Sequence, residues 1–94
     1  MNKRGRYVET REYVQMIRRS LRALAKRIGE GADVELLSEM VTLQQELDEA
    51  VVGAVAGLRD QYSWSEIAAR VGITKQSAHG KWAKKIDEME RSHD

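Results

Sequence analysis

The sequence of 94 residues contains no cysteine, no proline and no phenylalanine. Without cysteine there is no disulfide, no thiolate ligand for zinc and no thiol nucleophile, so nothing requires an oxidising compartment. The chain also lacks a long apolar run, because its longest near-apolar stretch, residues 50–58, is far shorter than the roughly 20 residues that span a membrane. Charged residues follow the amino terminus directly, which argues against a signal peptide. We therefore expect a cytoplasmic protein without a membrane segment.

The absence of proline removes the residue that most often interrupts helices. Charged residues make up 33% of the chain, and Ala, Glu, Arg and Leu, which favour helices, are abundant. At 94 residues the chain is long enough for one domain with a modest helical core. The composition therefore predicts an all-α fold.

The net charge is only +1, but charge is segregated along the chain. Residues 1–27 hold nine Lys or Arg against two Glu, whereas residues 28–60 hold one Arg against eight Asp or Glu. Residues 61–86 are again basic, with five Lys or Arg against one Glu, and residues 87–94 form an acidic tail. A local basic face, rather than net charge, brings a protein onto a phosphate backbone, and two segments can supply one.

Two long segments carry apolar residues at the spacing of an amphipathic helix. The first follows a flexible basic arm, predicted for residues 1–6, and covers about residues 7–28. Its stripe consists of Val14, Ile17, Leu21, Leu24 and Ile28. After a turn at residues 29–32, Asp33 is placed to cap a second helix that runs to about Asp60. The apolar set of that helix consists of Leu36, Leu37, Met40, Val41, Leu43, Leu47, Val51, Ala54, Val55 and Leu58.

The short turn predicts that these two helices form a long antiparallel hairpin over residues 7–60. A basic first helix complements an acidic second one, but exposed ion pairs contribute little, so the apolar stripes must supply most of the stability. The hairpin has more apolar surface than two helices hide from each other, and it is therefore the expected dimerisation element. Packing of the hairpin against the carboxy-terminal segment, which leaves a monomer, is the alternative.

A short capped helix is predicted to begin after Ser63. The hydroxyl of Ser63 can accept from the free amides of the first turn, and Glu66 can accept from the amide of Ser63, which completes an S-x-x-E capping box. Tyr62 and Ile67 are placed to form the hydrophobic staple that fixes the entry angle of the chain. The sequence therefore predicts a well-defined amino-terminal helix boundary here.

This helix is predicted to run to Val71 and to end at Gly72, which has no Cβ and can adopt the left-handed conformation of a helix end. Thr74 can cap a second helix that starts at Lys75. A capped helix, a short glycine turn and a second capped, basic helix form a helix-turn-helix. We predict this motif for residues 61–94, with the last helix extending into the acidic tail.

Residues 63–86 resemble the helix-turn-helix of the last DNA-binding region of bacterial sigma factors, and that of small bacterial and phage regulators. The residues that match the pattern and form the expected motif core are Ile67, Ala68, Val71, Gly72, Ile73, Ala78 and Trp82. Ala68 must be small because the two helices cross closely there, while the aliphatic residues fill the wedge between them. The chain departs from many relatives at Ala78 and Lys81, where they place large aliphatic residues; here Trp82 and Ile86 continue the apolar stripe.

The resemblance implies DNA contacts from the exposed side of the second helix. Lys75 and Gln76 are the expected base readers, because Lys donates to guanine and Gln pairs with adenine, and His79 is the next candidate. The expected backbone contacts are Ser65, Thr74, Ser77, Lys81, Lys84 and Lys85. For His79 and the lysines the alternative is a solvated surface role, and for Thr74 it is capping. Trp64 and Trp82 are more simply explained by packing than by base stacking.

An enzymatic role finds no support in the sequence. His79 has no serine or carboxylate placed to form a triad with it, and His93 lies in the tail. No glycine-rich phosphate loop follows a strand, and the carboxylates show no metal-ligand spacing. We expect no enzymatic activity, no metal and no cofactor.

The sequence thus predicts an all-α protein in which a long antiparallel hairpin precedes a helix-turn-helix. The expected function is sequence-specific binding of double-stranded DNA, as a homodimeric bacterial or phage transcription regulator with residues 75–86 in the major groove. The alternative is a protein-binding adaptor or antitoxin-like module that docks on RNA polymerase or another protein through the hairpin. Salt-dependent binding to random duplex DNA distinguishes the two.

Overall fold

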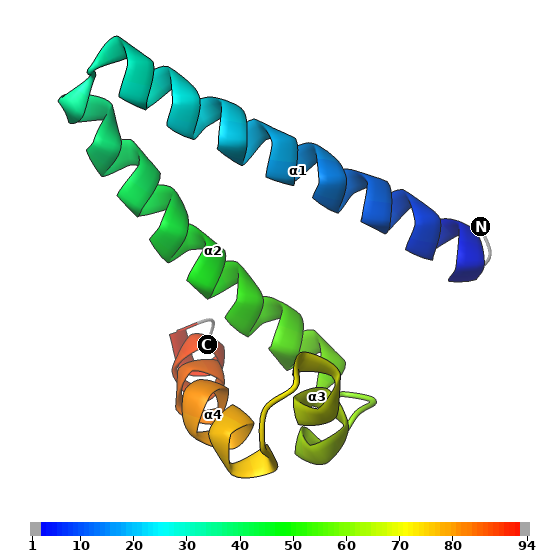
Figure 1. The fold of residues 1–94 in the computed structure, drawn as a ribbon. Helices are drawn as coiled ribbons and strands as arrows, with labels where there is room; N and C mark the ends of the chain where they lie inside the picture. The colour runs from blue at the N-terminus through cyan, green and yellow to red at the C-terminus, as the bar shows by residue number, and fades with distance from the viewer. Residues whose placement is uncertain (1–2, 93–94) are drawn as a thin grey trace. The chain divides into compact units, whose positions relative to one another are not determined.

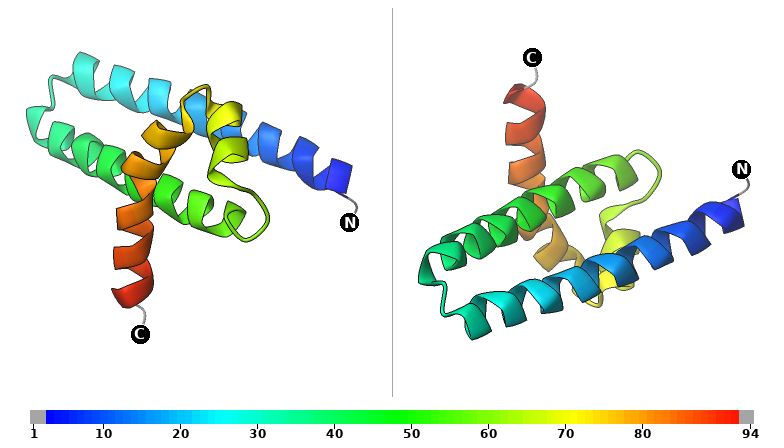
Figure 2. Two further views of the ribbon diagram at one scale, coloured as in Figure 1. Left: turned by 90° about the horizontal axis from the view of Figure 1, so that it is seen from below. Right: turned by 90° about the horizontal axis from the view of Figure 1, so that it is seen from above.

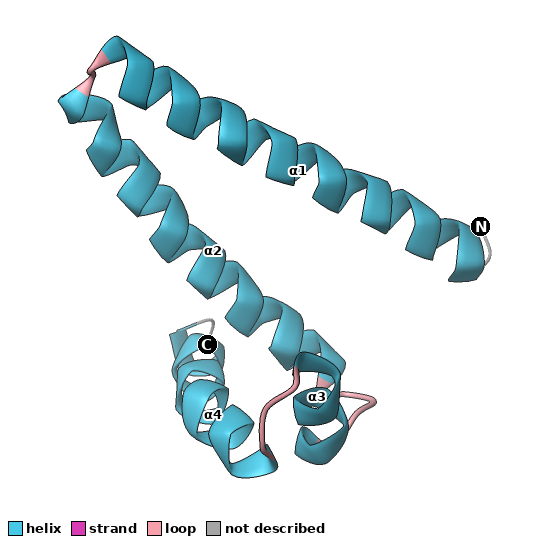
Figure 3. Cartoon of the chain, in the orientation of Figure 1, coloured by secondary structure: helices cyan, strands magenta, loops and turns pink. Residues whose placement is uncertain are grey.

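The computed structural model describes residues 3–92, and all of its regular elements are helical (Figure 3). In chain order these are α1 (Lys3–Gly31), a short 3-10 turn (Val34–Leu36), α2 (Leu37–Leu58), α3 (Trp64–Val71) and α4 (Lys75–Ser92), as labelled in Figure 1. The predicted all-α fold is confirmed. No described helix combines the length and the apolarity needed to cross a membrane.

The chain divides into two compact units. Unit 1 ends at Val41 and contains α1, the 3-10 turn and the first residues of α2. Unit 2 begins at Thr42 and contains the rest of α2 together with α3 and α4. The predicted hairpin involves both units, and the packing of its two helices stays a prediction.

The helix α1 begins earlier than expected. It starts at Lys3, so residues 3–6 of the predicted flexible arm are helical, while residues 1–2 lie outside the described residues. Lys and Arg are good helix formers, and the carbonyl of Arg6 accepts a bond from Thr10 Oγ1 at 2.8 Å inside the helix. The prediction of a flexible arm was therefore wrong for these residues.

The end of α1 lies inside the predicted turn of residues 29–32. The helix continues through Gly31, and Ala32 adopts the left-handed conformation, with φ 52°. The amide of Asp33 donates to the carbonyl of Ile28 at 3.2 Å, and that of Ala32 donates to Gly29 at 3.3 Å, which is a Schellman ending. These bonds form only after Gly31, so the two glycines belong to the helix rather than to the turn.

Asp33 does not act as the predicted side-chain cap. It precedes the 3-10 turn, but its side chain makes no capping hydrogen bond. Its backbone, at φ −93° and ψ 78°, lacks the extended conformation that directs a capping side chain toward the first amides. Ser63, which does cap a helix, has φ −76° and ψ 164°. The expectation that the Asp33 side chain caps the second helix was therefore wrong.

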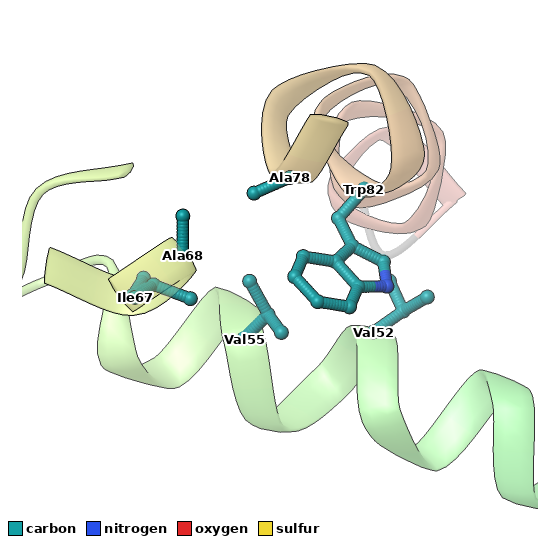
Figure 4. Close-up of a cluster of buried hydrophobic side chains, with 6 residues drawn as sticks. All are labelled: Val52, Val55, Ile67, Ala68, Ala78 and Trp82. Carbon is teal, nitrogen blue, oxygen red and sulfur yellow. The ribbon is translucent and has the colours of Figure 1, made fainter. Parts of the chain in front are cut away.

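Unit 2 contains the hydrophobic core of the described chain. Its buried residues are Val52, Val55, Ile67, Ala68, Ala78 and Trp82. In Figure 4 the indole of Trp82 lies against Val52 and Val55, while Ala78 points toward Ala68. Two views of the chain show that α4 crosses α2 rather than running beside it (Figure 2). The core therefore joins three helices that are separate in sequence.

The buried side of α2 agrees only in part with the one predicted. Val55 of the predicted apolar set is buried. Val52, which was not in the predicted apolar set, is only 7% exposed, whereas Val51 and Leu58 from that set remain exposed. Among the described residues of unit 1 none is buried: Val14, Ile17 and Leu21 of the α1 stripe are exposed, and Leu24 and Ile28 are partly buried. Each long helix thus has exposed apolar side chains, among them Val14 and Leu21 on α1 and Val51 and Leu58 on α2.

Candidate functional site

The first part of the candidate site is the capped start of α3. Glu66 N donates to Ser63 Oγ at 3.1 Å, and Ser63 N donates to Glu66 Oε1 at 3.1 Å. The predicted capping box is thereby confirmed. The hydrogen bonds from the backbone and the side chain of Ser63, together with the nearby charge of Arg70, lower the pKa of Glu66.

The lowered pKa of Glu66 makes this cap sensitive to acid. A carboxyl whose pKa is lower in the folded chain than in the unfolded chain, where it is about 4.3, stabilises the fold at pH values above that unfolded pKa. This stabilisation is lost as the pH falls through the pKa of the folded chain. We expect the stability advantage of the wild type over Glu66→Gln to shrink below about pH 4.3. Gln can still accept from the Ser63 amide but does not titrate.

Urea denaturation of the wild type and of Glu66→Gln across the acidic range measures this difference. Because all other carboxyls are common to both proteins, the difference isolates Glu66. A stability difference that is constant with pH would show that the ionised carboxylate contributes nothing to the cap.

The turn between α3 and α4 follows the predicted chemistry. Gly72 has φ 77° and ψ 31°, the left-handed conformation in which a Cβ is unfavourable. Ile73 N donates to Ala68 O at 3.0 Å and closes the end of α3. Thr74 Oγ1 accepts from Ser77 N at 3.0 Å at the start of α4, which confirms the predicted cap.

Small residues hold α3 and α4 together. Ala68 is 2% exposed and Ala78 is 0% exposed, while Ile73 and Ile86 pack partly buried against the same core. The expected wedge role of Val71 was wrong, because this side chain is 57% exposed. Val71 is the last residue of α3 and lines an open groove.

The opposite side of α4 presents polar groups to solvent. Lys75, Gln76, His79 and Gly80 are all exposed and line one shallow hollow of about 420 Å³. The structure thus brings the three predicted base-reading side chains together. Trp82, on the other side of the helix, is 7% exposed and anchors α4 in the core.

Trp64 connects the two helices beside this hollow. Its ring meets the imidazole of His79 edge to face, with ring centroids 5.4 Å apart and planes at 73°. The guanidinium of Arg59 also lies over the Trp64 ring, with Cζ 4.8 Å from the ring centroid. Arg59 additionally donates to the carbonyl of Tyr62 at 3.0 Å. The packing role expected for Trp64 agrees with its partly buried position.

The sequence did not identify Arg59 as part of the candidate site around Trp64 and His79. The sequence placed it at the end of a long helix, in an otherwise acidic segment, and gave no reason to connect it with the next helix. The signal that could have found it is the sequence Arg-Asp-Gln-Tyr-Ser-Trp, which places a cation five residues before an aromatic across a tight turn. The structure makes it a fixed positive charge beside the start of α3.

The residues predicted for backbone contacts are all exposed. They are Ser65, Thr74, Ser77, Lys81, Lys84 and Lys85. Lys81 Nζ lies 5.8 Å from the ring centroid of Trp82. In the described part of the chain, the ion pair that forms joins Arg91 to Asp87 at 2.7 Å. No carboxylate there lies within ion-pair distance of Lys81, Lys84 or Lys85. Their charges therefore remain available to an anion.

An apolar groove lies on another side of unit 2. It has a volume of about 790 Å³, and its wall combines α2, α3, the connection between them and Trp82. The aliphatic and aromatic side chains at its open edge are Val51, Leu58, Tyr62 and Val71, each of them exposed. Both members of the predicted staple, Tyr62 and Ile67, line this groove.

Comparisons with protein-family models, with curated proteins and with solved structures find no match. Among residues 3–92 no group of His, Asp and Glu side chains is placed to hold a metal ion. Function must therefore be inferred from the residues of the chain itself.

Proposed function

We propose that this chain is a sequence-specific double-stranded DNA-binding protein, acting in the cytoplasm as a small bacterial or phage transcription regulator. In this proposal α3 and α4 form a helix-turn-helix, and α4 enters the major groove. The observation that carries the proposal is the division of α4 into two faces. Ala78 and Trp82 are buried in the core of unit 2. Lys75, Gln76 and His79 share an exposed hollow on the other side.

The exposed face has the chemistry that base reading requires. The major groove presents a distinct pattern of donors and acceptors for each base pair. Gln76 has one acceptor and two donors on a planar amide and suits adenine, while Lys75 suits the acceptors of guanine. His79 is the third reader, and the contact with Trp64 orients its ring. Both Lys75 and Gln76 lie in the first turn of α4, the end that approaches base edges in this class of motif.

The unpaired cations of the helix support the phosphate contacts of the proposal. Lys81, Lys84 and Lys85 neutralise phosphates, and the hydroxyls of Ser65 and Ser77 donate to them. Thr74 uses its hydroxyl oxygen as the cap of α4, so its part in the interface is to position the helix. These contacts supply affinity without sequence preference.

Gly80 gives a test of close approach in the proposed interface. It lies inside α4, and a Cβ built there would meet no heavy atom within 4 Å, so the fold itself does not require glycine. Because Ala is the better helix former, we expect Gly80→Ala to stabilise the protein by about 0.5–1 kcal/mol. We expect the same change to weaken DNA binding, since the added methyl group would hold the duplex away from α4. Thermal melting and a binding titration measure the two effects.

Gly53→Ala is the matched control. Gly53 is also an exposed glycine inside a helix, and a Cβ there likewise meets nothing within 4 Å, but it lies in α2, away from the hollow of α4. It should raise the melting temperature and leave the affinity for random duplex, which does not require two half-sites, unchanged. Equal DNA binding by Gly80→Ala and the wild type would mean that the duplex does not approach α4 at this residue.

A homodimer is part of the proposal. One helix-turn-helix reads only a few base pairs, and two copies read two half-sites. The exposed apolar residues of the long helices, such as Leu21, Leu47 and Val14, support residues 7–60 as the element that joins the copies. The stoichiometry of the saturated complex with a symmetric site reports whether two chains bind.

The alternative is a protein-binding adaptor or an antitoxin-like module, which would dock on RNA polymerase or another protein. The open apolar groove beside Tyr62 and Val71 is the observation that favours it. A titration of random duplex DNA at several salt concentrations separates the two functions. The regulator binds with an affinity that falls steeply with salt, because counterions are released, whereas a pure adaptor does not bind.

A further inference from the structure

The helix α1 carries a row of arginines that the proposed helix-turn-helix does not use. Arg4, Arg11 and Arg18 are seven residues apart, and Arg22 follows four residues later. Residues separated by four or seven positions lie on one side of an α-helix, and α1 is helical throughout this stretch. These four residues, here called the arginine row, extend over about 27 Å at 1.5 Å per residue. All four are exposed.

The charges of the arginine row are not compensated within unit 1. Among the described residues of this unit, no carboxylate lies within ion-pair distance of a member of the row. The nearby carboxylates, Glu9 and Glu12, fall on other sides of α1, because neither is three, four or seven positions from a member of the row.

Arg11 is also held in place by a neighbour on the same helix. Its guanidinium donates to Tyr7 Oη at 3.2 Å and lies 5.9 Å from the centroid of that ring. One N–H is used in this bond, and the guanidinium has further donors for a ligand. The side chain is thus oriented before any partner binds.

We infer that the arginine row is a second DNA contact, which binds the phosphate backbone of the duplex without reading its sequence. This inference rests on the proposed function, because a chain bound through α4 presents α1 with the same polyanion at high effective concentration. The guanidinium group of arginine presents paired N–H donors that match two oxygens of a phosphate, and each of the four members of the row is an arginine rather than a lysine. The row borders the apolar stripe at Val14, which lines one hollow of α1 together with Arg11 and Arg18. Ile17 and Leu24 fall on another side of the helix, so that side can pack on another helix while the row binds DNA.

The test replaces three members of the row together, Arg11→Gln, Arg18→Gln and Arg22→Gln. Gln has nearly the helix propensity of Arg, so α1 is retained, and circular dichroism verifies this. We expect the slope of log affinity against log salt on random duplex to fall by about 2.7, since each neutralised phosphate contributes about 0.9. Affinity for a preferred site should fall by the same factor as affinity for random duplex, so that specificity is unchanged.

The matched control is Arg6→Gln/Arg27→Gln, which is compared with the double row variant Arg11→Gln/Arg18→Gln. It removes the same charge from exposed positions of α1 outside the row, and its salt slope should change by less than about 0.9, the share of a single phosphate. An equal reduction in both double variants would overturn the inference, because net charge alone would then explain it. An unchanged salt slope in the row variant would also overturn the inference. The same holds if the row variant binds phosphatidylserine vesicles more weakly than the wild type but binds duplex DNA equally well. A wild type that binds no duplex would instead refute the proposed function and this inference with it.

Discussion

Trp82→Ala is expected to destabilise the protein by roughly 3–5 kcal/mol, the usual cost of removing a buried tryptophan side chain. Trp82 is 7% exposed and its indole lies against Val52 and Val55 of α2 (Figure 4). It is the large residue in a core whose other members are valines, alanines and one isoleucine. A small domain is stable by only about 5–15 kcal/mol, so the expected decrease is a large part of the total. Urea denaturation followed by circular dichroism measures it.

A pair of Val→Ala variants provides the control for burial. Val52 is 7% exposed in the core, whereas Val71 is 57% exposed at the edge of the groove. Removing two methyl groups from Val52 should cost roughly 1.5–2.5 kcal/mol, at about 0.8 kcal/mol per buried carbon and an added cavity. The same change at Val71 should cost less than about 0.5 kcal/mol. If Trp82→Ala costs no more than Val71→Ala, then Trp82 does not anchor α4.

Local chemistry around the turn was predictable because it depends on neighbours in sequence. Ser63 and Glu66 are three residues apart, and their two hydrogen bonds form within one helical turn. Gly72 and Thr74 likewise act on backbone atoms of adjacent residues. The same reasoning was less successful at the end of α1, where Ala32 adopts a conformation that favours glycine, although Gly31 stands directly before it. Composition and spacing place a helix end to within a few residues only.

The position of the core could not be predicted in the same way. Apolar residues near the end of α2 lie on more than one side of the helix, and both Val51 and Val52 are suitable for burial. The path of α4, which crosses α2, determines that Val52 is covered and Val51 is not. Val71 has the spacing of a wedge residue, three positions after Ala68, but α3 ends there and nothing covers it. Such choices depend on packing between distant segments rather than on periodicity.

The candidate DNA-reading face was predictable in part. The stripe of Ala78 and Trp82 identified the buried side of α4, and the exposed positions of Lys75 and Gln76 follow from helical geometry. The ring contact between His79 and Trp64 was not predictable, because it joins two helices across the turn.

The Lys75→Ala/Gln76→Ala double variant should lose most of its preference for a specific DNA site. Each side chain is expected to contribute about 1–3 kcal/mol to recognition of its base pair, which is about 5- to 150-fold in affinity. Both residues are exposed and neither belongs to the hydrophobic core, so the melting temperature should change little. Selection from a random DNA library supplies the preferred site. Binding titrations on this site and on random duplex then measure the preference.

Lys84→Ala/Lys85→Ala is the control for the double variant. These lysines are exposed on the same helix, but they are assigned to phosphates, so their removal should weaken binding to all sequences alike. The salt slope should fall by about 0.9 for each phosphate that is no longer neutralised, and the ratio of specific to random affinity should stay constant. The Lys75/Gln76 variant should show the reverse, a reduced ratio with a change in slope of at most about 0.9. Wild-type affinity for the selected site in a folded Lys75/Gln76 variant would exclude α4 as the recognition helix and favour the adaptor function.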